Sequence, residues 1–98
     1  MSKPEKLRRV ILKISGELFG RNGENISFPR IEEAAKQLIS IEQSTGVQMA
    51  VVVGGGNIFR GRQANSEVDP TEADSMGMLA TVMNGIGLRE ALVRNGAR

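Results

Sequence analysis

Two kinds of hydrophobic pattern alternate along the chain. Residues 8–15 (RRVILKIS) and 47–53 (VQMAVVV) are short apolar runs rich in β-branched side chains, which is typical of buried strands. Between them, residues 29–45 carry apolar side chains at helical spacing, with Pro29 in the first turn and Gly46 just past the end. Strand, helix and strand in this order predict a βαβ unit with parallel strands and a right-handed crossover.

Residues 69–96 have the pattern of a second long helix. We expect Asp69 to cap it, with Pro70 in the first turn and Glu72 completing a capping box, and Gly96 to end it. Four large apolar residues recur at helical spacing: Met76, Leu79, Met83 and Ile86. We expect the methionines to fill the core.

Glycines at positions 77, 85 and 87 interrupt the second predicted helix. Each costs about 1 kcal/mol relative to alanine inside a helix, so we expect another helix or a ligand to come close there.

No third strand follows, and a two-stranded parallel sheet has two unpaired edges. The pattern therefore predicts a fragment of a larger α/β domain. Its basic first residues, 1–7, are expected to form a solvated, disordered tail.

Composition narrows the chemistry that is available. The 98 residues include no cysteine and no histidine, which excludes thiolate nucleophiles, disulfides and a histidine general base. The formal net charge is only +2, and the aromatic residues are three phenylalanines without interleaved basic residues, so no nucleic-acid partner is expected. The apolar runs are too short to cross a bilayer and no signal peptide is evident, so we expect a cytoplasmic protein without a membrane partner.

Glycine-bearing loops follow both predicted strands, at residues 13–17 (KISGE) and 54–61 (GGGNIFRG). The carboxyl ends of parallel strands meet at the edge of a sheet where ligands bind. Glycine N–H groups facing a cleft can bind an anion, and Arg60 can add a bidentate contact to a phosphate. A generic glycine turn is the alternative for residues 54–56. Lys13 is either an edge-strand lysine or a cation held at the cleft.

The two common phosphate-binding motifs do not fit the second loop. Residues 56–63 (GNIFRGRQ) have the glycine spacing of a Walker A loop, but Arg62 and Gln63 replace its lysine and hydroxyl residue. A dinucleotide-binding fingerprint counted from Gly54 meets Phe59 where its third glycine should be.

Three segments together resemble the bacterial UMP kinase branch of the amino acid kinase superfamily: LKISGE, VVVGGGNIFRG and DSMGMLATVMNGIGLREAL. The third is the most specific, and the likeness runs from about Arg8 to Leu92. The resemblance implies a three-layer αβα sandwich with a mainly parallel sheet. This chain would be its N-terminal, UMP-binding part with a βαβα core. The family carries a further half that holds most of the ATP-binding region.

The resemblance also implies a reaction, transfer of the γ-phosphoryl group of ATP to UMP with Mg²⁺, and roles for individual residues. Lys13 and Arg60 would be catalytic, with Lys13 stabilising charge on the transferred group. The ATP-binding residues would be Lys13, Ser15, Gly16, Gly56 and Arg60, the UMP-binding residues Gly55 and Asp74, and no residue is assigned to a metal. Without the resemblance, Asp74 would be a carboxylate that favours the helix dipole.

The residue types suit this reaction because a phosphate monoester acceptor is already ionised at neutral pH and needs no general base. Positioning, cations and N–H groups lower the barrier instead. Three other functions stay open: a superfamily kinase acting on a carboxylate or carbamate, a non-catalytic nucleotide-binding fragment, and an interaction module that uses the second helix. The resemblance further implies a homohexamer with GTP and UTP as effectors, with Arg89 and Glu90 at an interface or effector contact.

Overall fold

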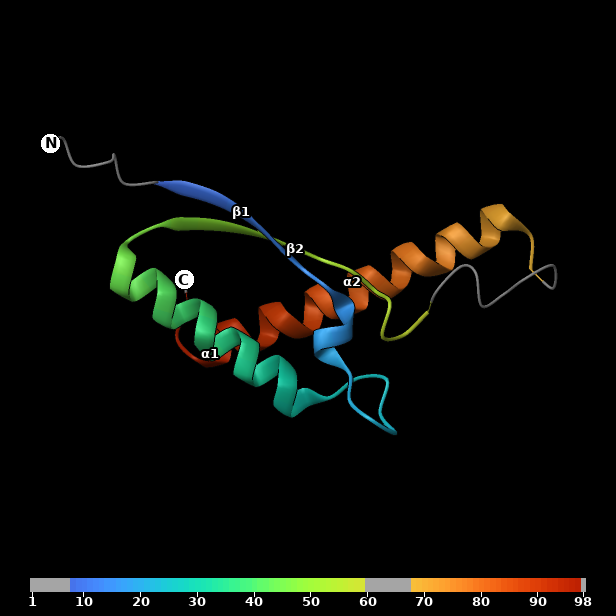
Figure 1. Cartoon of the computed structure of the whole chain (residues 1–98), viewed down its shortest axis with the longest axis horizontal. Helices are drawn as coiled ribbons and strands as arrows, with labels where there is room; N and C mark the ends of the chain where they lie inside the picture. Colours follow the sequence, from blue (N-terminus) through green and yellow to red (C-terminus); the bar gives the residue numbers. More distant parts are fainter. Residues whose placement is uncertain (1–7, 60–67, 98) are drawn as a thin grey trace, which may run out of the picture.

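The computed structural model describes residues 8–59 and 68–97, which form two strands, two long helices and one short 3₁₀ helix (Figure 1). In chain order these are β1 (Arg9–Ile14), η1 (Gly16–Phe19), α1 (Phe28–Thr45), β2 (Gln48–Val53) and α2 (Pro70–Arg94). The strands and helices predicted from the sequence are confirmed to within two residues at each end. The predicted tail, residues 1–7, lies outside the described residues.

The strands β1 and β2 pair in parallel, and α1 connects them. The register runs from Arg9 opposite Gln48 to Ile14 opposite Val53. The predicted βαβ unit is therefore confirmed, and both strands end at the same edge of the sheet.

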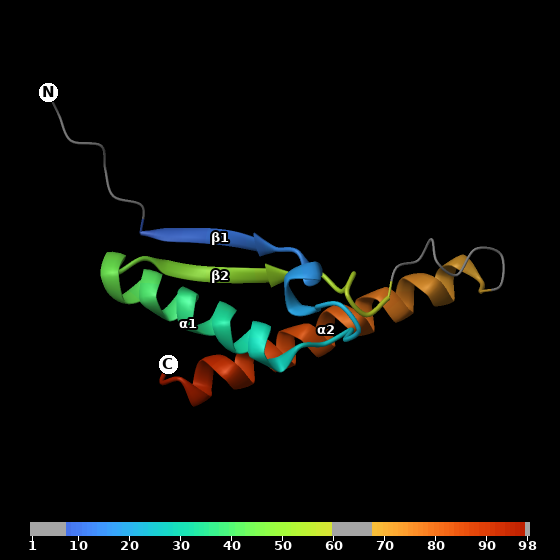
Figure 2. The same ribbon diagram turned by 60° about the horizontal axis from the view of Figure 1, so that its bottom comes forward.

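Both helices lie against one face of the sheet (Figure 2). A core of six buried residues lies between α1, α2 and η1: Phe19, Ile31, Ala35, Leu38, Leu88 and Ala91. Residues of the sheet that pack against this core include Ile14, Met49, Val51 and Val53. The α/β class is confirmed, and the described residues supply two parallel strands and the helices on one face of them, as in one side of an αβα sandwich.

The strands are covered on one face only, and even there their side chains are only partly buried, which corrects the expectation of two buried strands. Side chains alternate along a strand, so the neighbours of the core-facing residues point to the opposite face. On that face Ile11 is 75% exposed and Val52 is 52% exposed. The reason is that no helix in the described part of the chain covers it.

The predicted helix ends are found where the sequence places them. Gly46 has a left-handed φ of 71° and ends α1, and Gly96 has a φ of 94° just after α2. Asp69 caps α2, but its carboxylate accepts from the N–H of Thr71 at 2.9 Å, one residue before the donor of a capping box. At the start of α1, Ser27 accepts from the N–H of Arg30.

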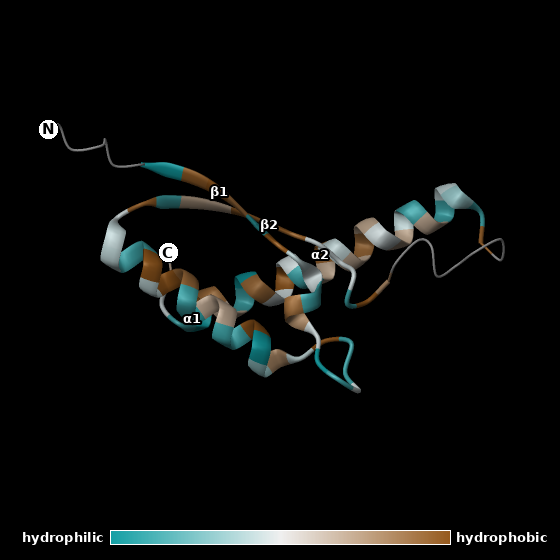
Figure 3. Cartoon of the chain, viewed as in Figure 1, coloured by the Kyte–Doolittle hydropathy of each residue, from teal (hydrophilic) through white to brown (hydrophobic). Residues whose placement is uncertain are grey.

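The core-facing side of α2 is not the one expected from its large apolar residues. Met76, Leu79, Met83 and Ile86 are between 45% and 64% exposed. The buried positions of α2 are small or polar, with one leucine: Ala73, Ala80, Asn84, Leu88 and Ala91. Hydrophobic positions extend along most of this helix (Figure 3), so hydropathy did not distinguish the two faces. The expectation that the methionines fill the core was wrong, because close packing of α2 on its neighbours selects small side chains.

The interior glycines of α2 differ in their surroundings. A Cβ atom added at Gly87 would lie 3.3 Å from Ile31 Cδ1, so α1 approaches closely there. At Gly77 and Gly85 no described atom lies within 4 Å of such a Cβ, apart from chain neighbours and the adjacent backbone of α2 itself. The predicted close approach is therefore confirmed at Gly87, and at the other two positions it is not found among the described residues.

Candidate functional site

The two glycine loops meet where β1 and β2 end. The N–H of Gly54 donates to the carbonyl of Ile14 at 3.1 Å, which continues the strand pairing by one residue. A Cβ atom on Gly16 would lie 2.7 Å from Gly54 O and 2.8 Å from Asn57 Oδ1, closer than real Cβ atoms approach. Position 16 therefore needs glycine because the second loop occupies the place of a side chain. The predicted adjacency of the two loops is confirmed.

Gly55 is enclosed from the other side by α2. A Cβ atom there would lie 2.8 Å from both Ala80 Cβ and the backbone nitrogen of Thr81. Neither Gly54 nor Gly55 has a left-handed φ, so their backbone conformation alone does not require glycine. Close approach explains Gly55 better than a generic turn does, and the approaching group in this structure is the protein's own helix.

The second loop turns immediately after these glycines. The N–H groups of Ile58 and Phe59 both donate to the carbonyl of Gly55 at 3.0 Å. Gly56 lies inside this turn, one residue after the contact with α2. Arg60, which sequence analysis places in the site, lies outside the described residues.

The first loop carries two further residues of the predicted site. Ser15 is exposed, and its Oγ accepts from the N–H of Glu17 at 3.3 Å, capping η1. Lys13 is exposed near the end of β1. Because Ile14 packs against the core, the alternation of side chains places Lys13 on the opposite face of the sheet, with Ile11 and Val52.

Asp74 belongs to the first turns of α2, which project beyond the carboxyl ends of the strands (Figures 1 and 2). Its side chain is exposed. Asp74 precedes Ala80, which contacts Gly55, by six residues, or about 9 Å along the helix axis. The structure thus brings Gly16 and Gly55 together at the carboxyl ends of the strands, with Ser15 and Gly56 next to them in the chain. Asp74 lies further out, beyond the same edge of the sheet.

A buried pair of asparagines, which the sequence pattern did not predict, lies beneath the second loop. Asn84 on α2 is 1% exposed, and its Nδ2 donates to Gly54 O at 2.8 Å and to Asn57 Oδ1 at 2.7 Å. The Nδ2 of Asn57 donates to Asn84 Oδ1 at 3.2 Å and to Asn25 O at 2.8 Å. The available signals were an asparagine inside the apolar segment ATVMNG and one directly after the glycines.

The clearest electrostatic interaction in the described residues joins the two helices away from the loops. The carboxylate of Glu32 on α1 accepts hydrogen bonds from Asn95 Nδ2 at 2.7 Å and from the guanidinium of Arg94. These bonds, that of Asn95 first, lower the pKa of Glu32, and the carboxylate raises the pKa of Arg94. This cluster ties the start of α1 to the end of α2 and holds the two helices together beneath the sheet.

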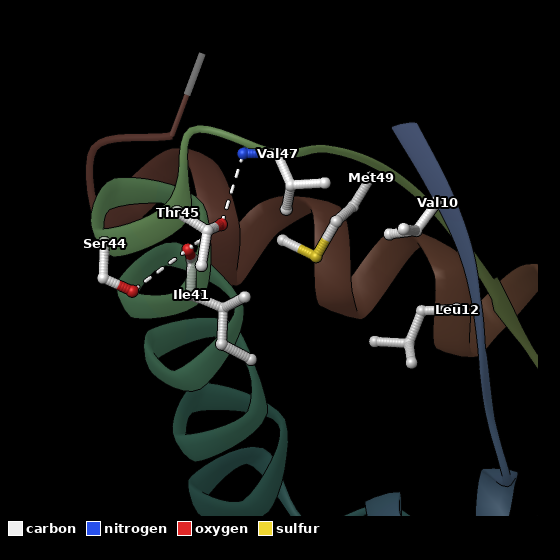
Figure 4. Close-up of a pocket in the computed structure, with 7 residues that line it drawn as sticks. All are labelled: Val10, Leu12, Ile41, Ser44, Thr45, Val47 and Met49. Carbon is white, nitrogen blue, oxygen red and sulfur yellow. Dashed lines mark hydrogen bonds between the residues drawn. The ribbon is translucent and has the colours of Figure 1, made fainter. Parts of the chain in front are cut away.

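A separate apolar hollow of about 580 Å³ opens near the amino ends of the strands (Figure 4). It is lined by uncharged residues of β1, β2 and the end of α1: Val10, Leu12, Ile41, Ser44, Thr45, Val47 and Met49. It contains no cation or glycine loop and lies at the opposite end of the sheet from Gly16 and Gly55. We therefore do not place phosphate chemistry there.

The described residues contain neither a metal-binding cluster nor a membrane-spanning helix. Within residues 8–59 and 68–97 there is no group of three or more acidic side chains that could hold a metal ion. No helix in the same part of the chain is long and apolar enough to span a membrane.

Comparison with known proteins agrees with this fold. The model of the amino acid kinase family matches residues 8–96, so the chain belongs to the amino acid kinase family. Within that family it is similar to the uridylate kinase of Deinococcus radiodurans (44% identity over 95 residues) and to that of Rhodopseudomonas palustris (48% over 93 residues). These alignments cover 96% and 93% of this chain but only 39% of each relative.

Solved structures give the same result. The UMP kinase of Ureaplasma parvum matches 91% of the chain with a TM-score of 0.80, and that of Bacillus anthracis matches 92% with a TM-score of 0.82. Both are 36% identical to this chain, which covers 39% and 37% of them. The chain therefore spans about two fifths of the length of the relatives it matches.

Proposed function

We propose that this chain is the UMP-binding part of a uridylate kinase, which transfers the γ-phosphoryl group of ATP to UMP and releases ADP and UDP. The observation that carries the proposal is the meeting of two glycine loops at the carboxyl ends of parallel strands, packed so tightly that neither Gly16 nor Gly55 has room for a Cβ atom. The named relatives and structural neighbours support the choice of UMP as acceptor.

The proposed chemistry uses charge and position without a general base. The phosphate oxygen of UMP that attacks ATP is ionised at neutral pH, so the chain's lack of histidine is no obstacle. We assign Lys13 to charge on the transferred group, and Ser15 and Gly16 to the ATP phosphates. Backbone N–H groups of the second loop provide further donors aimed at phosphate oxygens.

The second loop and α2 divide the remaining roles. We assign Gly56 and Arg60 to the ATP side, the latter from sequence alone, and Gly55 to the phosphate of UMP. Asp74 is assigned to UMP, because its helix projects beyond the carboxyl ends of the strands, the edge of the sheet where the glycine loops meet (Figure 2).

Magnesium is expected to arrive with ATP, held by the nucleotide phosphates and water. The described residues contain no acidic cluster that fits a dedicated metal site. No step of the proposed reaction is therefore assigned to a metal held by these residues.

A narrower function is also compatible with the length of the chain, which covers 39% of the relatives. In this case the chain binds UMP without turning it over. Release of ADP from ATP in the presence of UMP distinguishes the two, since only the catalytic form produces it.

Calorimetric titration tests the proposed acceptor. UMP is expected to bind the 98-residue chain, whereas aspartate, glutamate and carbamate are expected to give no heat of binding. Lys13→Ala is expected to weaken ATP binding more than Lys36→Ala, a matched loss of one exposed lysine on α1. Binding of a carboxylate or carbamate in place of UMP would support another kinase of the same family.

We also propose that the chain self-associates through the exposed apolar stripe of α2, formed by Met76, Leu79, Met83 and Ile86. Contiguous exposed apolar surface of this kind commonly marks an interface. The hexameric order and the response to GTP and UTP, both implied by the family resemblance, stay predictions.

A further inference from the structure

Asn84 and Asn57 form a closed ring of two amide–amide hydrogen bonds, at 2.7 Å and 3.2 Å. The second N–H of Asn84 donates to the carbonyl of Gly54, and that of Asn57 donates to the carbonyl of Asn25, both at 2.8 Å. All four amide hydrogens are therefore used. Because the outer partners are backbone carbonyls, which only accept, the orientation of both amides is fixed.

This ring lies under both loops of the site. The two oxygen atoms that receive the N–H groups of Asn84, Gly54 O and Asn57 Oδ1, are also the atoms that occupy the Cβ position of Gly16. Asn84 is buried, and no buried side-chain polar atom in the described ranges lacks a partner. A fully satisfied buried network of this kind is rigid. It therefore sets where the two loops lie relative to each other and to α2.

The ring also determines the orientation of one peptide unit. Asn84 holds the carbonyl of Gly54, and the described chain has no cis peptide bond. In a trans peptide the carbonyl and the following N–H point in opposite directions, so the N–H of Gly55 points away from Asn84. The carbonyl of Gly55 accepts from Ile58 and Phe59, but its N–H has no hydrogen-bond partner among the described residues.

We propose that Asn84, held in place by Asn57, is a positioning residue that turns the N–H of Gly55 outward to bind the phosphate of a nucleoside monophosphate. This inference rests on the proposed function, since it supplies the donor that UMP would meet. A merely structural contact between α2 and the loop needs no particular orientation of the Gly54–Gly55 peptide. The two hydrogen bonds that Asn84 donates, to Gly54 O and Asn57 Oδ1, fix that orientation.

The test compares ¹H–¹⁵N NMR spectra of the 98-residue chain with those of Asn84→Ala and Asn57→Ala. Asn95→Ala is the matched control. Its amide also donates two hydrogen bonds, to Glu32 Oε1 and Ala91 O at 2.7 Å, and it lies about 16 Å further along α2. Asn57 is only half-buried, so Asn57→Ala is expected to disturb folding less than Asn84→Ala. It therefore still tests the proposal if Asn84→Ala does not fold.

Without ligand, the Gly55 amide resonance is expected to move in the variants at 84 and 57 and to stay in place in Asn95→Ala. During titration with UMP, the same resonance is expected to shift in the unaltered chain, and both variants should need at least tenfold more UMP. The double variant should lose no more than either single one, because the two side chains act as a pair.

The proposal is overturned if the Gly55 amide is unmoved in both variants, if Asn95→Ala moves it equally, or if the variants bind UMP as tightly as the unaltered chain. A folded chain that shows no response to UMP contradicts the proposed function and the phosphate role of Gly55 together. In that case the ligand-free spectra still decide whether the ring orients the peptide.

Discussion

At the scale of single residues, the glycines of the site differ from those inside α2 in what surrounds them. Gly16 and Gly55 have no room for a side chain, whereas a Cβ atom at Gly85 meets no described atom within 4 Å beyond chain neighbours and the adjacent backbone of its own helix. The position of the glycine loops could be predicted, because each follows an apolar strand. The reason that each position needs glycine could not be predicted, since it depends on contacts with segments distant in the chain, Gly16 with Gly54 and Gly55 with Ala80.

Alanine substitution should therefore have opposite effects at two of these positions. Gly16→Ala is expected to destabilise the fold by about 2 kcal/mol, because the added methyl forces the second loop to move. Gly85→Ala is expected to stabilise it by about 1 kcal/mol, since alanine is the better helix former and the site is open. Urea denaturation measures both, and equal effects at the two positions would contradict the packing described for Gly16.

The hydrogen bonds to Glu32 predict a dependence of stability on pH. Its pKa is lowered in the folded chain from an ordinary value of 4.5, so its contribution is present above that value and is lost as the pH falls through the folded pKa. Glu32→Gln should therefore show a smaller loss of stability than the unaltered chain between about pH 5 and about pH 3.

Urea denaturation at several pH values checks this expectation. Glu33→Gln, an exposed neighbour on α1, is the control and should behave as the unaltered chain does. An identical loss of stability in the unaltered chain and in Glu32→Gln would show that the bonds to Arg94 and Asn95 do not contribute.

At the scale of elements, the sequence predicted the existence and ends of α2 but not its buried face. Caps such as Asp69 and Gly96 are local signals and were found in place. The buried face depends on Ala80, which is small, and Asn84, which is polar; both allow the helix backbone to reach Gly55 and its loop. Pattern alone favoured the larger side chains, which are exposed on other faces of the helix.

The exposed stripe of α2 predicts self-association. Leu79, at 64% exposed, is replaced by lysine and the oligomeric state is measured by sedimentation. We expect the unaltered chain to form a larger species that Leu79→Lys converts to monomer, because a charge within an apolar interface is costly. Phe28→Lys changes another exposed apolar residue, at the start of α1, and should leave the assembly intact. A monomeric unaltered chain would contradict the proposed interface.

At the scale of the whole molecule, the described chain is an α/β unit with one covered face. The sequence correctly predicted a parallel βαβ unit and a fragment of a larger domain, since neither edge of a two-stranded sheet is paired. It overstated the burial of the strands, because Ile11 and Val52 belong to the face that no described helix covers. The relatives are more than twice as long, in agreement with this open face.

The central claim is that the packed glycine loops bind the phosphate of UMP. Calorimetric titration of UMP into the unaltered chain, Gly55→Ala and Gly85→Ala tests it most directly, with folding of each verified by circular dichroism. We predict equal affinity for the unaltered chain and Gly85→Ala, and at least tenfold weaker binding by Gly55→Ala, whose methyl would clash with Ala80 and the backbone of Thr81. A folded unaltered chain that does not bind UMP, or a folded Gly55→Ala that binds it equally well, would contradict the claim.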